Sequence, residues 1–159
     1  MVQKTVKVFL DSNVILPGLI SDRGAPRLIL DVLGLELPVL RGVTGRYNLT
    51  EIERNIATKL PAARSVLGEC LPRMNIEIVF LPFLDEMEPF RGIVDDKDLP
   101  VVTSAAIAKA EYFLTGDKGL MSRIRRASGL AFLGLLPADF LNCFLPDILA
   151  GRNPQREEG

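Results

Sequence analysis

The sequence predicts an α/β fold of three layers, with a mostly parallel five-stranded sheet between two layers of helices. Short runs of β-branched and apolar residues alternate with segments of helical periodicity along the chain. This alternation is typical of a parallel sheet covered by helices on both faces. The length of 159 residues, with 48% of them hydrophobic, suffices for one domain with a buried core. We expect a single domain over residues 1–150 and a disordered tail over residues 151–159.

The first expected strand covers residues 5–10, a β-branched and apolar run that stops at Asp11. We expect Asp11, Ser12 and Asn13 to form a polar turn. A helix is expected over residues 19–33, where apolar residues recur at helical spacing, and Gly34 would end it. Further strands are expected at residues 37–40, 76–81, 112–115 and 130–136. Further helices are expected from Asn48, from Pro61 towards Leu71, and over residues 101–110, 119–126 and 137–149.

The composition excludes several kinds of active site. No His occurs among the 159 residues, which excludes Ser-His-Asp and Cys-His nucleophiles, His general bases and zinc sites that need imidazole. The 19 basic and 20 acidic residues leave a net charge of −1, which argues against binding nucleic acid by bulk charge. Cys70 and Cys143 are too few for a disulfide framework, and we expect both to be small buried hydrophobic residues in a reduced compartment.

Neither a signal peptide nor a membrane span is expected. Asp11 interrupts the N-terminal apolar run. The longest uncharged stretch, residues 127–138, contains Gly134 and Pro137 and is shorter than the roughly 20 residues that a spanning helix needs. We therefore expect a cytoplasmic protein with no membrane partner.

Four carboxylates are expected at one edge of the predicted sheet. Asp11 follows the first strand, Asp117 follows the fourth, Asp98 opens the helix after the third, and Glu51 lies on the helix after the second. Ligands of open α/β sheets bind outside the carboxyl ends of the strands. Each acid alone has a simpler interpretation, as a turn former, a helix cap or a solvated helix residue, and Glu53 competes with Glu51. The hypothesis of a site therefore depends on the convergence of all four acids.

Converging carboxylates indicate a divalent cation. Like charges at short range repel each other, and a cation between them removes that repulsion. Oxygen ligands without imidazole or thiolate suit Mg²⁺ or Mn²⁺. Such an ion lowers the pKa of a bound water and polarises a phosphoryl oxygen, and this chemistry needs no His.

Several segments together resemble a known family. They read VFLDSNVIL, LTEIERNI, DDKDLPVVTSAAIAKAEYFLTGDKGL and AFLGLLPADFLN. They closely resemble the PIN domain of prokaryotic toxin-type (VapC-like) ribonucleases, over about residues 6 to 142. The motif TGDKGL after an alanine-rich helix is fairly specific, whereas DSNV alone would be weak.

The resemblance implies a three-layer fold and a metal-dependent endoribonuclease that hydrolyses RNA phosphodiester bonds. The family's catalytic acids fall on Asp11, Glu51, Asp98 and Asp117. Of these, Asp11, Asp98 and Asp117 would hold Mg²⁺ or Mn²⁺. As partners, besides RNA, the resemblance implies an antitoxin protein, which would make this chain the toxin of a toxin–antitoxin pair, and a second copy in a homodimer.

Other positions follow from the same resemblance. Asn13 and Thr115 match the family's companion polar residues, and Asn13 would orient metal ligands or a metal-bound water. Asp95 matches an acid that we interpret as structural or as an outer contact of the site. The family pattern Glu-hydrophobic-x-Arg favours Glu51 over Glu53. The segment RGVTGRYN departs from the family, which usually has a Ser shortly after its second strand.

A basic segment follows Asp117 directly. Residues 118–138 contain Lys118, Arg123, Arg125 and Arg126 and no acid. These side chains could guide RNA phosphates towards the acids. The competing interpretation is a solvated helix face.

Two other functions compete with a nuclease. A phosphatase of the haloacid dehalogenase type also has an Asp after its first strand and uses Mg²⁺, but it needs Asp-x-Asp, and Asn13 occupies the third position here. A non-catalytic RNA-binding or protein-binding module on the same fold would have lost its acids, and none of the four is lost. A phosphoacceptor receiver domain is disfavoured, because the chain shows neither its acidic pair nor its Lys clearly.

Overall fold

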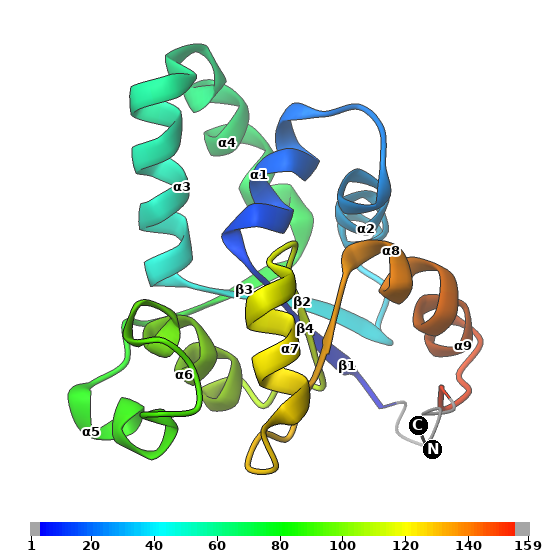
Figure 1. Cartoon of the computed structure of the whole chain (residues 1–159). Coiled ribbons are helices and arrows are strands. Elements are labelled where there is room, and N and C mark those ends of the chain that lie inside the picture. The colour runs from blue at the N-terminus through cyan, green and yellow to red at the C-terminus, as the bar shows by residue number, and fades with distance from the viewer. Residues whose placement is uncertain (1–3, 155–159) are drawn as a thin grey trace.

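The computed structural model describes residues 4–154 (Figure 1). The strands are β1 (Val6–Leu10), β2 (Leu40–Gly45), β3 (Ile76–Val79), β4 (Tyr112–Leu114) and β5 (Leu133–Leu135). The helices are α1 (Ser12–Ile20), α2 (Ala25–Gly34), α3 (Arg46–Lys59), α4 (Arg64–Cys70), α5 (Leu84–Met87), α6 (Leu99–Ile107), α7 (Lys118–Arg126), α8 (Pro137–Asp139) and α9 (Leu145–Leu149). Helical turns of other kinds lie at Pro61–Ala63, Leu71–Met74, Glu88–Phe90, Asp96–Asp98 and Phe140–Phe144.

Within the described residues, five strands form one sheet in the order β3-β2-β1-β4-β5, and every neighbouring pair is parallel. The predicted parallel sheet is confirmed. β1 is the central strand, with Val8 paired to Gly42 on one side and to Tyr112 on the other. The residue that follows β1 therefore lies between the ends of β2 and β4, in the middle of the sheet's carboxyl edge.

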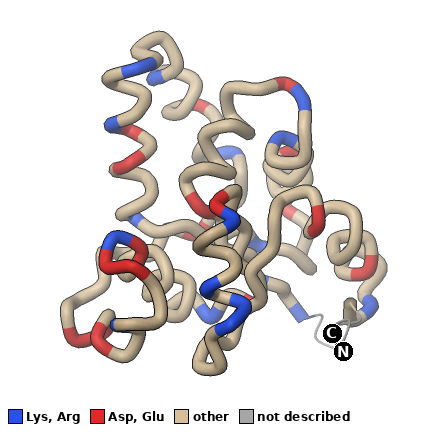
Figure 2. The backbone as a smooth tube through the Cα atoms, in the orientation of Figure 1, with Lys and Arg blue, Asp and Glu red and all other residues tan. Residues whose placement is uncertain are grey.

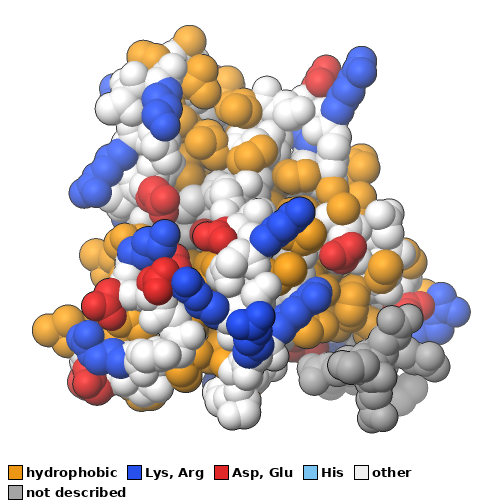
Figure 3. Space-filling view, viewed as in Figure 1, with side chains coloured by type: hydrophobic (Ala, Val, Ile, Leu, Met, Phe, Trp, Pro, Cys, Tyr) orange, Lys and Arg blue, Asp and Glu red, His pale blue; other side chains and the backbone are white. Residues whose placement is uncertain are grey.

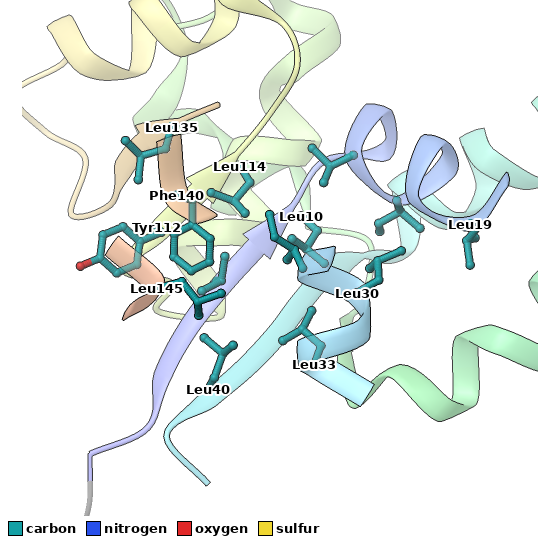
Figure 4. Close-up of a cluster of buried hydrophobic side chains, with 14 of the residues drawn as sticks. Leu10, Leu19, Leu30, Leu33, Leu40, Tyr112, Leu114, Leu135, Phe140 and Leu145 are labelled. Atoms are coloured by element: carbon teal, nitrogen blue, oxygen red, sulfur yellow. The ribbon is translucent and has the colours of Figure 1, made fainter. Parts of the chain in front are cut away.

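Helices cover both faces of the sheet, which confirms the three-layer prediction (Figure 1). Alternate residues of β1 point to opposite faces, because side chains alternate along a strand. Leu10 packs with apolar residues of α1, α2, α3 and α9, and Figure 4 shows part of this cluster around Leu10, Leu30 and Leu114. Phe9 packs on the other face with α6 and α7 residues and stacks on Phe113 at 5.1 Å between ring centroids.

The segment after β1 differs from the prediction. Residues 11–13 form no free-standing turn, because α1 begins at Ser12 and Asp11 is its N-cap. The helix expected over residues 19–33 is two helices, α1 and α2, which are separated at Gly24, where φ is 96°. The helices pack closely at Gly18, where a Cβ would lie 2.5 Å from Leu30 Cδ1. The predicted helix thus combined the last two residues of α1 with α2, and residues 12–18 of α1 were not predicted to be helical.

The second strand also lies later than predicted. β2 begins at Leu40, and residues 37–39 belong to a turn. The strand contains Gly42 and Gly45, residues that strands disfavour, and this composition concealed it. Glycine suits position 42, because a Cβ there would lie 2.8 Å from Leu33 Cδ1 of α2 and would displace that side chain.

The remaining elements are close to the predictions but differ at their ends. β3 stops at Val79, so that Phe80 leaves the sheet with 88% of its surface exposed. The last helix is interrupted by the wide turn Phe140–Phe144. Cys143 is exposed and Cys70 is partly buried, so the expectation that both are buried is wrong for Cys143. In the described part of the tail, residues 151–154 form no helix or strand, while residues 155–159 lie outside the described residues and their predicted disorder stays a prediction.

No helix within residues 4–154 is both long and apolar enough to cross a membrane.

Candidate active site

Asp11 lies at the centre of the candidate site. It extends β1 through a hydrogen bond from its backbone N–H to the Leu114 carbonyl (3.0 Å), and only 8% of its surface is exposed. Its Oδ1 accepts hydrogen bonds from the Ser12 backbone N–H (2.8 Å) and from Asn48 Nδ2 (3.1 Å). Its Oδ2 accepts one from the Thr115 hydroxyl (2.8 Å). These donors come from α1, α3 and the end of β4, and they fix the carboxylate at the point where three elements meet.

The end of β4 is tied to α1 by the two companion residues. Gly116 N–H donates to Asn13 Oδ1 (2.8 Å), and Asn13 Nδ2 donates to Thr115 Oγ1 (3.3 Å). Asp117 N–H donates to the same hydroxyl (3.0 Å), and its Oδ1 caps α7 by accepting from Leu120 N–H (3.1 Å). The structure thus brings Asn13 and Thr115 together beside Asp11, as predicted. Asp117 is also the helix cap that the simpler interpretation requires, and one of its oxygens serves that role.

The geometry separates Glu51 from Glu53. Ser12 Oγ donates to Glu51 Oε2 (3.1 Å), which joins Glu51 to the Asp11 cluster. Glu53 lines a cavity of about 370 Å³ between α3 and α4, together with Leu67. Of the two candidates, Glu51 therefore lies at the site, in agreement with the interpretation of the sequence.

Asp98 and Asp95 precede α6 and differ in their contacts. Asp98 is partly buried and, within the described structure, its side chain makes no capping bond to α6. Asp98 thus occupies the N-cap position of α6, as the simpler interpretation has it, but its side chain does not cap the helix. Asp95 forms an ion pair with Arg123 of α7. This pair joins the loop before α6 to α7, which agrees with a structural role for Asp95.

The pKa values of two of these acids are raised, first by burial and to a smaller extent by the other acids. Burial raises the pKa of Asp11 to about 6, against the hydrogen bonds from Thr115 and Ser12, and the charges of Glu51 and Asp98 raise it further. Burial also raises the pKa of Asp98. Lys97 and Arg123 oppose this rise, and the charges of Asp117 and Asp95 add to it. The four acids are thus linked electrostatically, Asp11 to Glu51 and Asp98, and Asp98 to Asp117.

The donor chemistry fits Mg²⁺ or Mn²⁺, because the acids supply only oxygen and their repulsion would be relieved by a cation. Among residues 4–154, no group of three or more His, Cys, Asp or Glu residues has the arrangement of a ready metal site. Mg²⁺ is usually bound through one or two carboxylates and keeps several waters, so a closed cage of side chains is not required. The acids that would hold an ion are Asp11, Asp98 and Asp117.

Comparisons with known proteins bear on this geometry. No family model matches the sequence, and the search of curated proteins found no match. Among solved structures, VapBC2 from Rickettsia felis bound to a DNA fragment from their promoter contains a similar chain, with a TM-score of 0.61 and 15% identity over 81% of this chain and 98% of that one. PAE2754 from Pyrobaculum aerophilum is also similar, with a TM-score of 0.57 and 16% identity over 91% of this chain and 96% of that one.

The chain has a VapC-like PIN fold. At identities of 15% and 16%, the likeness concerns the fold and not the chemistry. The resemblance that the sequence motifs suggested is thus confirmed at the level of architecture.

The basic residues of α7 lie on the same face as the acids. Figure 2 shows basic positions along α7, with acidic positions at its N-terminal end and in the loop before α6, and Figure 3 shows side chains of both signs close together on this face. Arg123 is paired with Asp95, and Arg125 Nε donates to the Gly134 carbonyl (2.8 Å). Lys118 and Arg126 form neither an ion pair nor a hydrogen bond through their side chains within the described residues. Of the four predicted basic residues, Arg123 and Arg125 thus have partners, and Lys118 and Arg126 have none within the described residues.

Ser12 and Asn48 contribute to the site, although the sequence interpretation gave neither a role. Asn48 is fully buried on α3, and Ser12 is 7% exposed. One signal was present in the sequence. Asn48 falls on the same helical stripe as Ile52 and Ile56, and a polar residue in such a stripe needs a partner when it is buried.

Proposed function

We propose that this chain is a metal-dependent endoribonuclease. One observation carries the proposal. Asp11, Glu51, Asp98 and Asp117 lie at the carboxyl edge of one parallel sheet, and burial, with a smaller contribution from the neighbouring acids, raises the pKa of Asp11 and Asp98. Acids held together in this way are typical of a site that binds a cation. The VapC-like PIN fold supports the same proposal.

Each acid has a separate role in the proposed reaction. Asp11, Asp98 and Asp117 would hold Mg²⁺ or Mn²⁺, with Asp11 fixed by its hydrogen-bond donors and Asp117 by its position at the start of α7. When bound, the ion supplies a Lewis acid for a phosphoryl oxygen and lowers the pKa of a water. Glu51, which Ser12 holds, would accept the proton of the attacking water or orient that water.

Thr115 and Asn13 would keep the Asp11 carboxylate in one orientation, because the Thr115 hydroxyl donates to Asp11 and is itself next to the Asn13 amide. Asn13 makes a phosphatase less suitable, because its side chain is bound to Gly116 N–H and its amide can neither donate nor accept the proton that the Asp-x-Asp chemistry requires.

RNA would be guided by the basic side chains of α7. Lys118 and Arg126 are free to contact phosphates. Arg125 and Arg123 would contribute positive charge from their present positions, and Arg123 would first have to leave Asp95 to contact a phosphate directly. Such contacts make binding depend on salt concentration.

The proposal extends to partners. VapBC2 is an assembly bound to a DNA fragment from its promoter. By this likeness, we propose that our chain is the toxin of a toxin–antitoxin pair, that it binds an antitoxin, and that it forms a homodimer. A cytoplasmic location, where RNA is the substrate, goes with this proposal.

The test is an RNA cleavage assay with wild-type protein and Asp11→Asn. Mixed RNA is incubated with Mg²⁺ or Mn²⁺, and then with EDTA. We expect cleavage that requires the metal and that falls on the order of 10³-fold in the variant. RNA binding without cleavage would support the non-catalytic module instead. Hydrolysis of a small phosphate ester, with RNA left intact, would support the phosphatase.

A further inference from the structure

Asn48 is a buried polar residue on the inner face of α3. None of its surface is exposed, and its helix buries Leu49, Ile52 and Ile56 on the same side. An apolar side chain at this position would extend the buried apolar face of α3 and would need no hydrogen-bond partner. The amide is therefore not explained by the packing of α3.

The amide nitrogen of Asn48 serves two acceptors at once. Nδ2 donates to Asp11 Oδ1 at 3.1 Å and to Ser12 Oγ at 2.9 Å. The Ser12 hydroxyl in turn donates to Glu51 Oε2 at 3.1 Å. A chain of hydrogen bonds thus runs from one amide to a carboxylate after β1 and to a carboxylate on α3.

The orientation of the amide is determined by these acceptors. If the amide were turned over, its carbonyl oxygen would face the Asp11 carboxylate, and two acceptors would be in contact. In the observed orientation, Oδ1 has no hydrogen-bond partner among the described residues. Leaving a buried carbonyl unpaired has a free-energy cost, so the donor side of the amide determines the conformation.

The neighbouring backbone leaves room for Asn48. A Cβ on Gly45 would lie 3.0 Å from Asn48 Oδ1 and 3.0 Å from Ser104 Oγ. The glycine at the junction of β2 and α3 therefore allows the amide to reach Asp11. This is the segment in which the sequence departs from the usual family pattern.

We propose that Asn48 is a positioning residue that holds Asp11 directly, and Glu51 through Ser12, at a fixed relative position. The proposal deepens the proposed function, because it concerns the acids of the same site. Asn48 itself touches neither the metal nor the substrate. It acts by restricting two carboxylates that come from different elements.

The first test measures the binding of Mn²⁺ alone, without RNA, by isothermal titration calorimetry. Asn48→Ala is compared with Asn55→Ala, which removes the same amide about two turns further along the same helix, where no side-chain hydrogen bond joins it to the described part of the site. We expect Asn48→Ala to weaken Mn²⁺ binding by about 10-fold or more, and Asn55→Ala to leave it unchanged. A purely structural role would lower the melting temperature without changing the affinity, and equal Mn²⁺ affinity in folded Asn48→Ala would overturn the proposal.

The second test needs neither metal nor activity, and it holds even if Asn48→Ala does not fold. The side-chain amide signal of Asn48 is followed by ¹H–¹⁵N NMR in wild-type protein and in Ser12→Ala. We expect slow exchange with solvent in the wild type and a clear change of chemical shift in the variant. An amide signal that exchanges freely and does not respond to Ser12→Ala would contradict the proposal. Failure of the wild type to bind Mn²⁺ would instead count against the proposed nuclease, and the NMR result would still test the hydrogen bond from Asn48 to Ser12 on which the proposal depends.

Discussion

The Asp11 carboxylate accepts hydrogen bonds from Ser12, Asn48 and Thr115, and its pKa is nevertheless raised. Burial therefore outweighs these bonds, and the charges of neighbouring acids act in the same direction. The ionised Asp11 carboxylate therefore lowers the free energy of unfolding of the metal-free protein at neutral pH. Buried charged groups that destabilise a fold are typical of functional sites. Here the oxygen donors around Asp11 favour a bound cation as that function.

This balance predicts a pH dependence of stability in EDTA. The pKa of Asp11 is about 6 in the folded chain against an ordinary value of 3.8, so the folded state binds more protons between these values. The free energy of unfolding should therefore fall as pH rises from about 4 to about 6, by an amount on the order of 3 kcal/mol for this group. Asp11→Asn removes the charge and should be more stable than the wild type at pH 7.5, as measured by urea unfolding.

The control for that measurement is Asp22→Asn, because the Asp22 side chain is 92% exposed and should change stability little. A lower stability of Asp11→Asn at pH 7.5 would show that the hydrogen bonds, and not burial, dominate at Asp11.

Sequence patterns could locate the acids but not the residues that hold them. Asp11 and Asp117 were recognisable, because each follows a buried strand in a predicted parallel sheet. Ser12 and Asn48 were not, because their roles depend on how α1 meets α3. That contact joins residues 36 positions apart, and no local periodicity encodes it.

At the scale of elements, the junction of β2 and α3 was the hardest to predict. Gly42 and Gly45 make β2 resemble a loop, yet other side chains approach both glycines closely, and a Cβ at either position would displace them. The low β-propensity of glycine therefore pointed away from a strand at the place where side chains pack closely around β2. The predicted helix over residues 19–33 also ran across the break between the end of α1 and the start of α2, where the two helices pack closely at Gly18.

The same junction gives a prediction about two glycines. Gly45→Ala would place a Cβ 3.0 Å from Asn48 Oδ1 and from Ser104 Oγ, so we expect a loss of about 1–3 kcal/mol in the free energy of unfolding together with weaker Mn²⁺ binding. Gly68→Ala is the matched control, because nothing lies within 4 Å of its Cβ position in α4, and alanine favours a helix by about 0.5–1 kcal/mol. Urea unfolding of both variants measures the difference. Equal and favourable effects at the two positions would contradict the account of Gly45.

At the scale of the whole molecule, the alternation of strands and helices was sufficient to predict the sheet and its layers. Right-handed crossovers between parallel strands leave few topologies, and the central position of β1 follows from the order β3-β2-β1-β4-β5. The surface could not be predicted in the same way. Residues 80 and 81 were predicted as the end of the third strand, yet Phe80 and Leu81 are exposed, as are Phe83 and Leu84 after them.

We expect the proposed homodimer to bury part of this exposed apolar segment. Phe80 is 88% exposed and Phe83 is 74% exposed, and clustered exposed aromatic side chains are typical of interaction surfaces. The double variant Phe80→Ser/Phe83→Ser should therefore shift sedimentation equilibrium towards the monomer, while its free energy of unfolding per monomer changes by no more than about 0.5 kcal/mol, because neither ring is packed in the core. Leu35→Ser is the control, since Leu35 is 67% exposed at the end of α2 and should leave association unchanged. A dimer that persists in the double variant and weakens in Leu35→Ser would place the contact between copies elsewhere on the molecule.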